Sequence, residues 1–148
     1  MRIALAADHA GYALKDELAV WLRELGYDVT DLGTNGSESV DYPEFGAKLA
    51  REVATGAAER GIAVCGSGIG ISIAVNRDPK CRCARVDEPI SAALAREHND
   101  ANVIALGARL VGSDMAKACV SAFLGTDFVG GRHQRRVDQL SSLLQDSD

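Results

Sequence analysis

Short apolar segments alternate along this chain with longer amphipathic segments, and this alternation constrains the fold more than any other feature. Runs rich in Val, Ile, Leu and Ala are typical of buried strands, and they lie at residues 3–7, 28–32, 62–65, 83–86 and 103–106. Segments with helical spacing of apolar residues lie at 11–25, 43–55, 69–76, 88–99, 113–124 and 133–144. Strands that are apolar on both faces and separated by helices indicate a parallel sheet with helices on each side. We therefore expect a doubly wound, Rossmann-like α/β fold, a three-layer sandwich with a five-stranded parallel sheet.

Length, charge and hydropathy favour one compact domain and exclude several classes of protein. A chain of 148 residues has the usual size of a single domain, so we expect one domain over residues 1–148. No apolar run approaches the roughly 20 residues that span a bilayer. The first nine residues resemble a strand more than a secretory signal, which predicts a cytoplasmic protein without a membrane partner. The net charge of −5 disfavours nonspecific binding of nucleic acid.

The cysteines indicate neither a disulfide framework nor a metal site. The chain has four, at positions 65, 81, 83 and 119, and a domain with an ample core does not need disulfides for stability. We expect free thiols in a reducing compartment. Cys81-x-Cys83 lacks a second ligand pair at zinc-finger spacing, so no metal is predicted.

One glycine-rich segment lies where a sheet of this kind binds its ligands, beyond the carboxyl ends of the strands. Cys65-Gly66-Ser67-Gly68-Ile69-Gly70 ends a predicted strand and begins a predicted helix. Its backbone amides can converge on an anion at the positive end of the helix dipole, and the same potential favours the thiolate of Cys65. The alternative is a buried structural cysteine beside a tight turn.

Three familiar loop types fit this segment poorly. No lysine follows the glycines, as a nucleotide phosphate loop requires. A dinucleotide fingerprint matches only in part, because Ile71 occupies the place of its third glycine. Residues 66–76 contain no arginine, so a thiol phosphatase would lack its phosphate-binding side chain.

Charged and imidazole side chains supply further candidates: Asp8, His9, His98, Arg109, Arg132 and Arg136. Asp8 and His9 follow the first predicted strand, where Asp8 could orient a substrate hydroxyl or cap the next helix. Arg132 and Arg136 are four residues apart and share a helix face, which suits a phosphate site or a solvated charged surface.

Six blocks of residues, in matching order, resemble the ribose-5-phosphate isomerase B family, which also includes the galactose-6-phosphate isomerase subunits. The resemblance covers almost the whole chain. The blocks are Asp8-His9-Ala10-Gly11, Asp41-Tyr42-Pro43, residues 65–76, Glu88-Pro89-x-Ser91-Ala92, His98-Asn99-Asp100-x-Asn102-Val103 and Gly130-Gly131-Arg132-His133-Gln134-x-Arg136.

The resemblance implies an aldose–ketose isomerase that interconverts ribose 5-phosphate and ribulose 5-phosphate through an enediolate, without a cofactor. It implies that Cys65 is the base and that His98 opens the sugar ring. The developing oxyanion would be held by the Ser67 hydroxyl and the amides of Gly66, Gly68, Ile69 and Gly70. The sugar hydroxyls would contact Asp8, His9 and Asn99. The phosphate would contact Arg109, Arg132 and Arg136. The family's usual assembly implies a homodimer or a tetramer, with pockets built from both subunits.

Two other functions remain open at this point. One is isomerisation of another sugar phosphate, such as allose 6-phosphate, galactose 6-phosphate or a tetrose phosphate, or of an unphosphorylated sugar. The other is a domain that binds a nucleotide or sugar phosphate without turnover. The chain also departs from the family pattern, with Ser67 where many members have threonine and with unusual residues around Cys81–Asp87.

Overall fold

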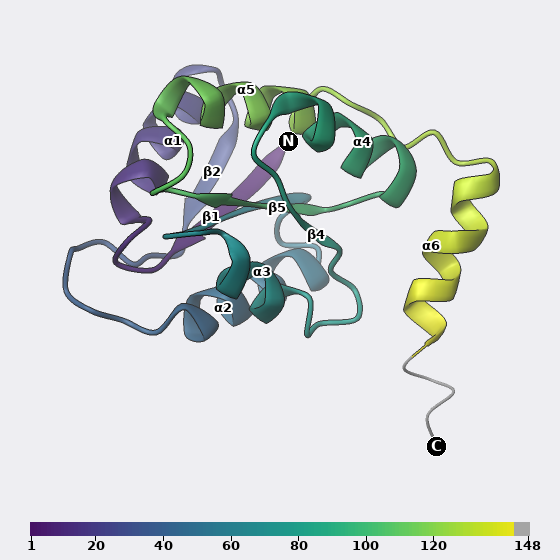
Figure 1. The fold of residues 1–148 in the computed structure, drawn as a ribbon, viewed down its shortest axis with the longest axis horizontal. Helices are drawn as coiled ribbons and strands as arrows, with labels where there is room; N and C mark the ends of the chain where they lie inside the picture. Colours follow the sequence, from purple (N-terminus) through teal and green to yellow (C-terminus); the bar gives the residue numbers. More distant parts are fainter. Residues whose placement is uncertain (144–148) are drawn as a thin grey trace.

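The computed structural model describes residues 1–143 and confirms the five-stranded parallel sheet, in the order β2-β1-β3-β5-β4 (Figure 1). The strands are β1 Arg2–Ala7, β2 Asp28–Asp31, β3 Arg60–Cys65, β4 Cys83–Arg85 and β5 Val103–Gly107. The helices are α1 Tyr12–Glu24, α2 Tyr42–Ala54, α3 Ile69–Val75, α4 Pro89–Asn99, α5 Ser113–Leu124 and α6 Arg132–Ser142. Every predicted element is therefore confirmed to within a few residues. Leu144, predicted to continue the last helix, lies outside the described residues.

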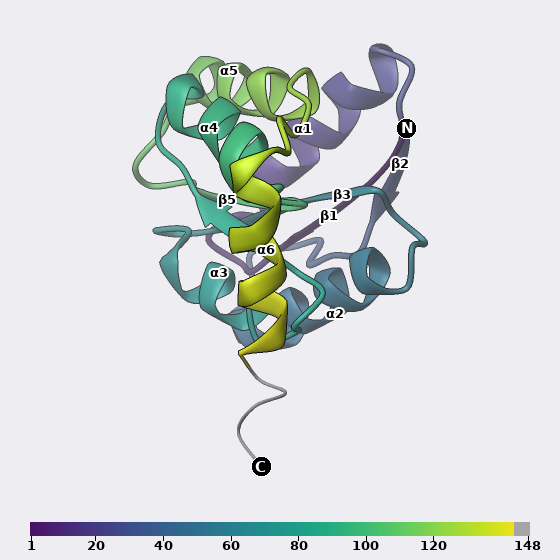
Figure 2. The same cartoon turned by 90° about the vertical axis from the view of Figure 1, so that its right-hand side faces the viewer.

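Helices cover both faces of the sheet and complete the predicted three-layer sandwich. Helices α1, α4 and α5 lie on one face, and α2 and α3 lie on the other (Figures 1 and 2). Helix α6 differs from the rest, because it projects at the side of the sandwich, past the end of α4 (Figure 1).

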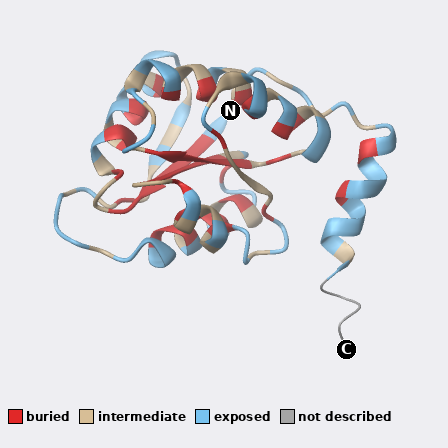
Figure 3. Cartoon of the chain, in the orientation of Figure 1, coloured by how far each residue is buried: buried red, intermediate tan, exposed pale blue. Residues whose placement is uncertain are grey.

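The central strands are buried on both faces, as their sequence predicted (Figure 3). In β1, Ile3 and Leu5 pack toward α1, α4 and α5, whereas Ala4 packs toward α2 and α3. In β3, Val64 packs toward α1, α4 and α5, whereas Cys65 packs toward α2 and α3. The side chain of Cys65 thus faces the α2–α3 layer at the very end of its strand.

A buried lysine ties α1 to the segment after β2, and helical periodicity did not predict it. Lys15 is fully buried, and its Nζ lies 2.7 Å from Oδ1 of Asp16 and 2.7 Å from both carboxylate oxygens of Asp31. It also donates to Oδ1 of Asn35 at 3.3 Å, while Asp31 accepts from the Gly33 amide at 2.9 Å. This network holds the segment that begins at Gly33 against β1.

The strand order reverses at β1, because β2 lies on one side of it and β3 on the other. The carboxyl ends of β1 and β3 therefore border the crevice in which open α/β sheets bind ligands. Asp8 and Cys65 lie at this point. No helix within residues 1–143 has both the length and the apolar character that crossing a membrane requires.

Candidate active site

A cavity of about 360 Å³ opens at the carboxyl edge of the sheet, between the ends of β1, β3 and β5. Its walls are formed by Asp8, His9, Ala10, Tyr42, Cys65, Gly66, Ser67, Gly70, Arg109 and Leu110. Most of the residues that the sequence analysis placed at this edge therefore do line one cavity. Ala10, Tyr42 and Leu110 were not proposed as site residues, although Ala10 and Tyr42 belong to the family's sequence blocks.

The thiol of Cys65 lies against the cavity and accepts a hydrogen bond from the main chain. Only 4% of the residue is exposed, and its Sγ accepts from the Gly68 amide at 3.1 Å. Gly68 adopts a left-handed conformation with φ of 76°, and a Cβ there would lie 2.9 Å from the carbonyl carbon of Leu106. Glycine is thus required at position 68 to turn this amide toward the sulfur.

The rest of the glycine loop is held by contacts that leave two amides available. The Ser67 hydroxyl accepts from the Ile69 amide at 3.2 Å, and the Ser67 carbonyl accepts from Nε of Arg85 at 2.8 Å. The amides of Gly66 and Gly70 have no hydrogen-bond partner within the described part of the chain. These two donors can therefore bind an anionic oxygen. The amides of Gly68 and Ile69, which were expected to do the same, instead donate to Cys65 and Ser67 within the loop.

Asp8 and His9 are each oriented by the main chain. Oδ1 of Asp8 accepts from the amides of Ala10 at 3.0 Å and Gly11 at 3.1 Å, so Asp8 stabilises the turn before α1. Nδ1 of His9 lies 3.1 Å from the amide nitrogen and 3.2 Å from the carbonyl oxygen of Val40. Whichever tautomer is present, Val40 fixes the ring by Nδ1 and leaves Nε2 for a ligand.

Arg109 supplies the positive charge of this cavity. Its amide donates to the Gly66 carbonyl at 3.0 Å, and its guanidinium packs so closely on Gly66 that a Cβ there would lie 3.0 Å from Nη1. A planar guanidinium fixed at the mouth of a cavity suits an anionic group such as phosphate.

His98, Asn99, Arg132 and Arg136 are not at this cavity. Helix α4 runs back along the sheet and ends at Asn99, just before β5 begins at Val103. Cys65, in contrast, pairs with Gly107 at the other end of β5. Five extended residues span about 13 Å, so within one chain His98 and Cys65 lie at opposite edges of the sheet.

These four residues form a second group with the start of α6. The imidazole rings of His98 and His133 stack with centroids 4.3 Å apart and an interplanar angle of 13°. Asn99 and Arg136 line a shared hollow beside Leu140. Burial lowers the pKa of His133, and the positive charges of His98, Arg132 and Arg136 lower it further. The group is thus a concentrated basic surface on an acidic protein.

The remaining cysteines are free thiols outside the cavity at Cys65. Cys81 and Cys83 line a hollow that they share with Asn99 and Leu140, whereas Cys119, on α5, is buried in the core. Burial raises the pKa of Cys81 and of Cys119 to about 11. Within residues 1–143, no three His, Cys, Asp or Glu side chains gather as they would to hold a metal ion.

Known proteins are similar to this chain in sequence and in fold over nearly their whole length. The family described as Ribose/Galactose Isomerase matches residues 3–140. Ribose-5-phosphate isomerase B of Escherichia coli is 46% identical over 97% of both chains. The structure of ribose-5-phosphate isomerase B from Clostridium thermocellum superposes with a TM-score of 0.98, at 47% identity over all of both chains.

A third relative was solved with a ligand. Ribose-5-phosphate isomerase B from Mycoplasma genitalium, with bound ribulose 5-phosphate, superposes with a TM-score of 0.94 at 36% identity, over 99% of this chain and 97% of its own. Matches of this extent, together with the cavity around Cys65, mean that the chain belongs to the ribose/galactose isomerase family.

Proposed function

We propose that this protein interconverts ribose 5-phosphate and ribulose 5-phosphate as one isomerase domain, with Cys65 as the base. The observation that carries the proposal is the Sγ of Cys65, which accepts from the Gly68 amide in a cavity that also holds Asp8, His9 and Arg109. The activity named for the relatives from E. coli and C. thermocellum, and the ribulose 5-phosphate bound in the M. genitalium enzyme, support this choice of substrate.

The chemistry needs a base and an oxyanion site on the same intermediate. The thiolate of Cys65 takes the proton from C2 of the open-chain aldose, and the C–H electrons form the C1–C2 double bond while O1 becomes negative. The amides of Gly66 and Gly70, with the Ser67 hydroxyl, bind this oxygen. The thiol then returns the proton to C1, while the O2 hydroxyl proton passes to O1. The product is a ketone at C2, with no net change of oxidation state.

The ring of ribose 5-phosphate must open before this step, and we assign that task to His98. Opening breaks the bond between C1 and the ring oxygen, which gains a proton while the C1 hydroxyl loses one. An imidazole can take one of these protons and return the other. Asp8, His9 and Asn99 would bind the sugar hydroxyls, and Arg109, Arg132 and Arg136 the phosphate.

Because Cys65 and His98 lie at opposite edges of one sheet, we propose that each active site is shared between two copies of the chain. Large apolar side chains near the cavity support a second copy there, because Ile69, Ile73 and Leu110 are each about half exposed, at 50%, 49% and 59%. A homodimer is the smallest assembly that brings the two groups together. The free thiols agree with a reducing cytoplasmic location.

An assay that measures ketose formation from ribose 5-phosphate tests the proposal. Cys65→Ala should lower kcat roughly 10²–10⁴-fold, as loss of a general base does, while phosphate binding changes little. Cys119→Ala is the matched control, because it removes a buried thiol that lies outside the cavity and outside the group around His98. Arg136→Ala should mainly raise KM, since phosphate binding is shared by ground and transition states.

A panel of sugar phosphates compared by kcat/KM, including allose 6-phosphate, galactose 6-phosphate and a tetrose phosphate, tests the choice of substrate. Full turnover by Cys65→Ala would contradict the assignment of the base. Binding of ribose 5-phosphate without ketose formation by the wild-type protein would instead indicate a binding domain.

A further inference from the structure

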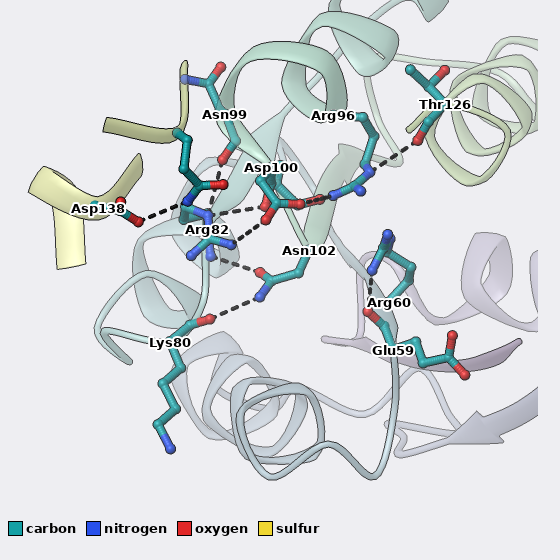
Figure 4. A network of polar contacts seen from close by, with 12 residues as sticks. Glu59, Arg60, Lys80, Arg82, Arg96, Asn99, Asp100, Asn102, Thr126 and Asp138 are labelled. Carbon is teal, nitrogen blue, oxygen red and sulfur yellow. Dashed lines mark hydrogen bonds and ion pairs between the residues drawn. The ribbon is translucent and has the colours of Figure 1, made fainter. Parts of the chain in front are cut away.

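The end of α4, which carries His98 and Asn99, is held by a network of arginines that the proposed chemistry does not use (Figure 4). A helix normally leaves its last four carbonyls without intrahelical partners. Here Nε of Arg82 donates to the carbonyls of Asn99 and Asp100, both at 3.0 Å. Nη1 of Arg96 donates to the carbonyl of Ala101 at 2.7 Å. Three successive carbonyls after His98 are therefore bound by guanidinium groups.

One carboxylate joins the two arginines. Oδ1 of Asp100 lies 2.8 Å from Nη1 of Arg96, and its Oδ2 lies 3.3 Å from Nη2 of Arg82. Asp100 is also the only residue other than glycine with positive φ within residues 1–143, at 46°. A side chain with two charged partners at such a position holds the chain reversal after α4 in one conformation.

The network is itself anchored on three sides. The amide of Arg82 donates to Oδ1 of Asn102, and Nδ2 of Asn102 donates to the carbonyl of Lys80, both at 2.8 Å. The guanidinium of Arg96 is buried, and its Nε donates to the carbonyl of Thr126 at 3.2 Å. The segment before β4, the end of α4 and the segment leading to α6 are thus linked through Asp100, as Figure 4 shows.

We propose that Asp100, held between Arg82 and Arg96, is a positioning residue that sets the place of His98 and Asn99 in the active site. This inference rests on the proposed function, in which His98 opens the sugar ring. Asp100 does not touch the substrate. It acts by fixing the main chain of the two residues that precede it, and through Arg96 and Thr126 it also fixes the approach to α6.

Ring opening and proton transfer can be measured separately, which distinguishes positioning from general damage. Ribulose 5-phosphate is an open-chain ketose, so the enzyme can exchange its C1 hydrogen with D2O through Cys65 without any ring step. Asp100→Gly tolerates the positive φ and removes only the carboxylate. We expect kcat for net isomerisation to fall about 10- to 100-fold, as small misplacements of reacting groups do. Deuterium uptake at C1, measured at saturating ribulose 5-phosphate so that weaker contacts to Asn99 do not limit it, should fall by less than about threefold.

Two further variants keep the test decisive if Asp100→Gly does not fold. Arg82→Ala should show the same change in the ratio of exchange to turnover. Asp100→Asn, which tolerates positive φ and still accepts a hydrogen bond, should recover part of the lost turnover. Arg2→Ala is the matched control, since Arg2 also bonds two carbonyls, of Gly56 and Ala57, at this edge of the sheet. An equal fall in exchange and turnover, or no fall in either, overturns the inference.

The inference and the proposed function can fail separately. If the wild-type protein does not convert ribose 5-phosphate, the proposed function fails. The positioning claim is then tested by the proton NMR signals of the His98 ring. These signals should shift in Asp100→Gly and not in Arg2→Ala, and unchanged signals would refute the claim.

Discussion

A mixture of two inactive variants should recover activity if each active site is shared between two copies of the chain. Cys65→Ala removes the proposed base at the carboxyl edge of the sheet, and His98→Gln removes the proposed ring-opening group at the amino edge. Within one chain these residues lie at opposite ends of β5, because Cys65 pairs with Gly107 and His98 precedes Val103. A shared site therefore takes one residue from each copy.

The expected recovery follows from the symmetry of a dimer. Random pairing of equal amounts makes about half of the dimers mixed, and each mixed dimer has one site with both substitutions and one with neither. The mixture should therefore show about a quarter of the wild-type activity. The assay is kcat for ribose 5-phosphate after the two variants are unfolded together and refolded, compared with each variant treated alone.

A control pair makes this test specific. Cys65 and Arg109 line the same cavity, so a mixture of Cys65→Ala and Arg109→Ala contains no site free of substitutions. That mixture should show no activity beyond the sum of its parts. If the first pair fails to recover, or if both pairs recover equally, the shared site is wrong.

Three other predictions concern stability and thiol reactivity. Lys15→Met should lower the free energy of unfolding by about 1–2 kcal/mol, measured by urea denaturation, because the partly buried carboxylate of Asp31 loses its cation; a change near zero would refute this. Gly68→Ala should lower the free energy of unfolding by about 1–2 kcal/mol because of the positive φ at this position. It should also lower kcat, since the added Cβ meets the main chain of Leu106. Wild-type stability and turnover in this variant would contradict the close approach of Gly68 to Leu106. Cys81 and Cys119, with pKa values raised to about 11 by burial, should resist iodoacetamide at pH 8 in peptide mapping, and rapid labelling would show that they are accessible.

Local pattern was sufficient to predict the elements of this fold, because each depends on its own periodicity of apolar residues. Pro43 lies in the first turn of α2, and Phe45 and Leu49 are buried on successive turns of this helix, as their spacing indicated. The glycines around Cys65 likewise indicated a strand-to-helix turn whose main chain can approach a ligand closely. The rule that parallel strands present their carboxyl ends at one edge then placed Asp8, Cys65 and Arg109 together.

The partition of the candidate residues into two groups emerged only from the topology. A helix between two parallel strands runs back along the sheet, so His98, at the end of α4, lies at the amino edge rather than beside Cys65. The order of elements already implies that His98 lies near the start of β5. Its distance from Cys65 follows only when the strands are placed side by side in the sheet.

The sequence by itself determined the α/β class, the order of elements and the reactive turn at Cys65, since these follow from short-range pattern and backbone sterics. Only the tertiary structure decided that Lys15 is fully buried and that Asp100 joins Arg82 to Arg96. A charged side chain has no periodic signature of its own. Its role depends on which acceptors distant segments bring within hydrogen-bond distance, and that is a property of the packed chain.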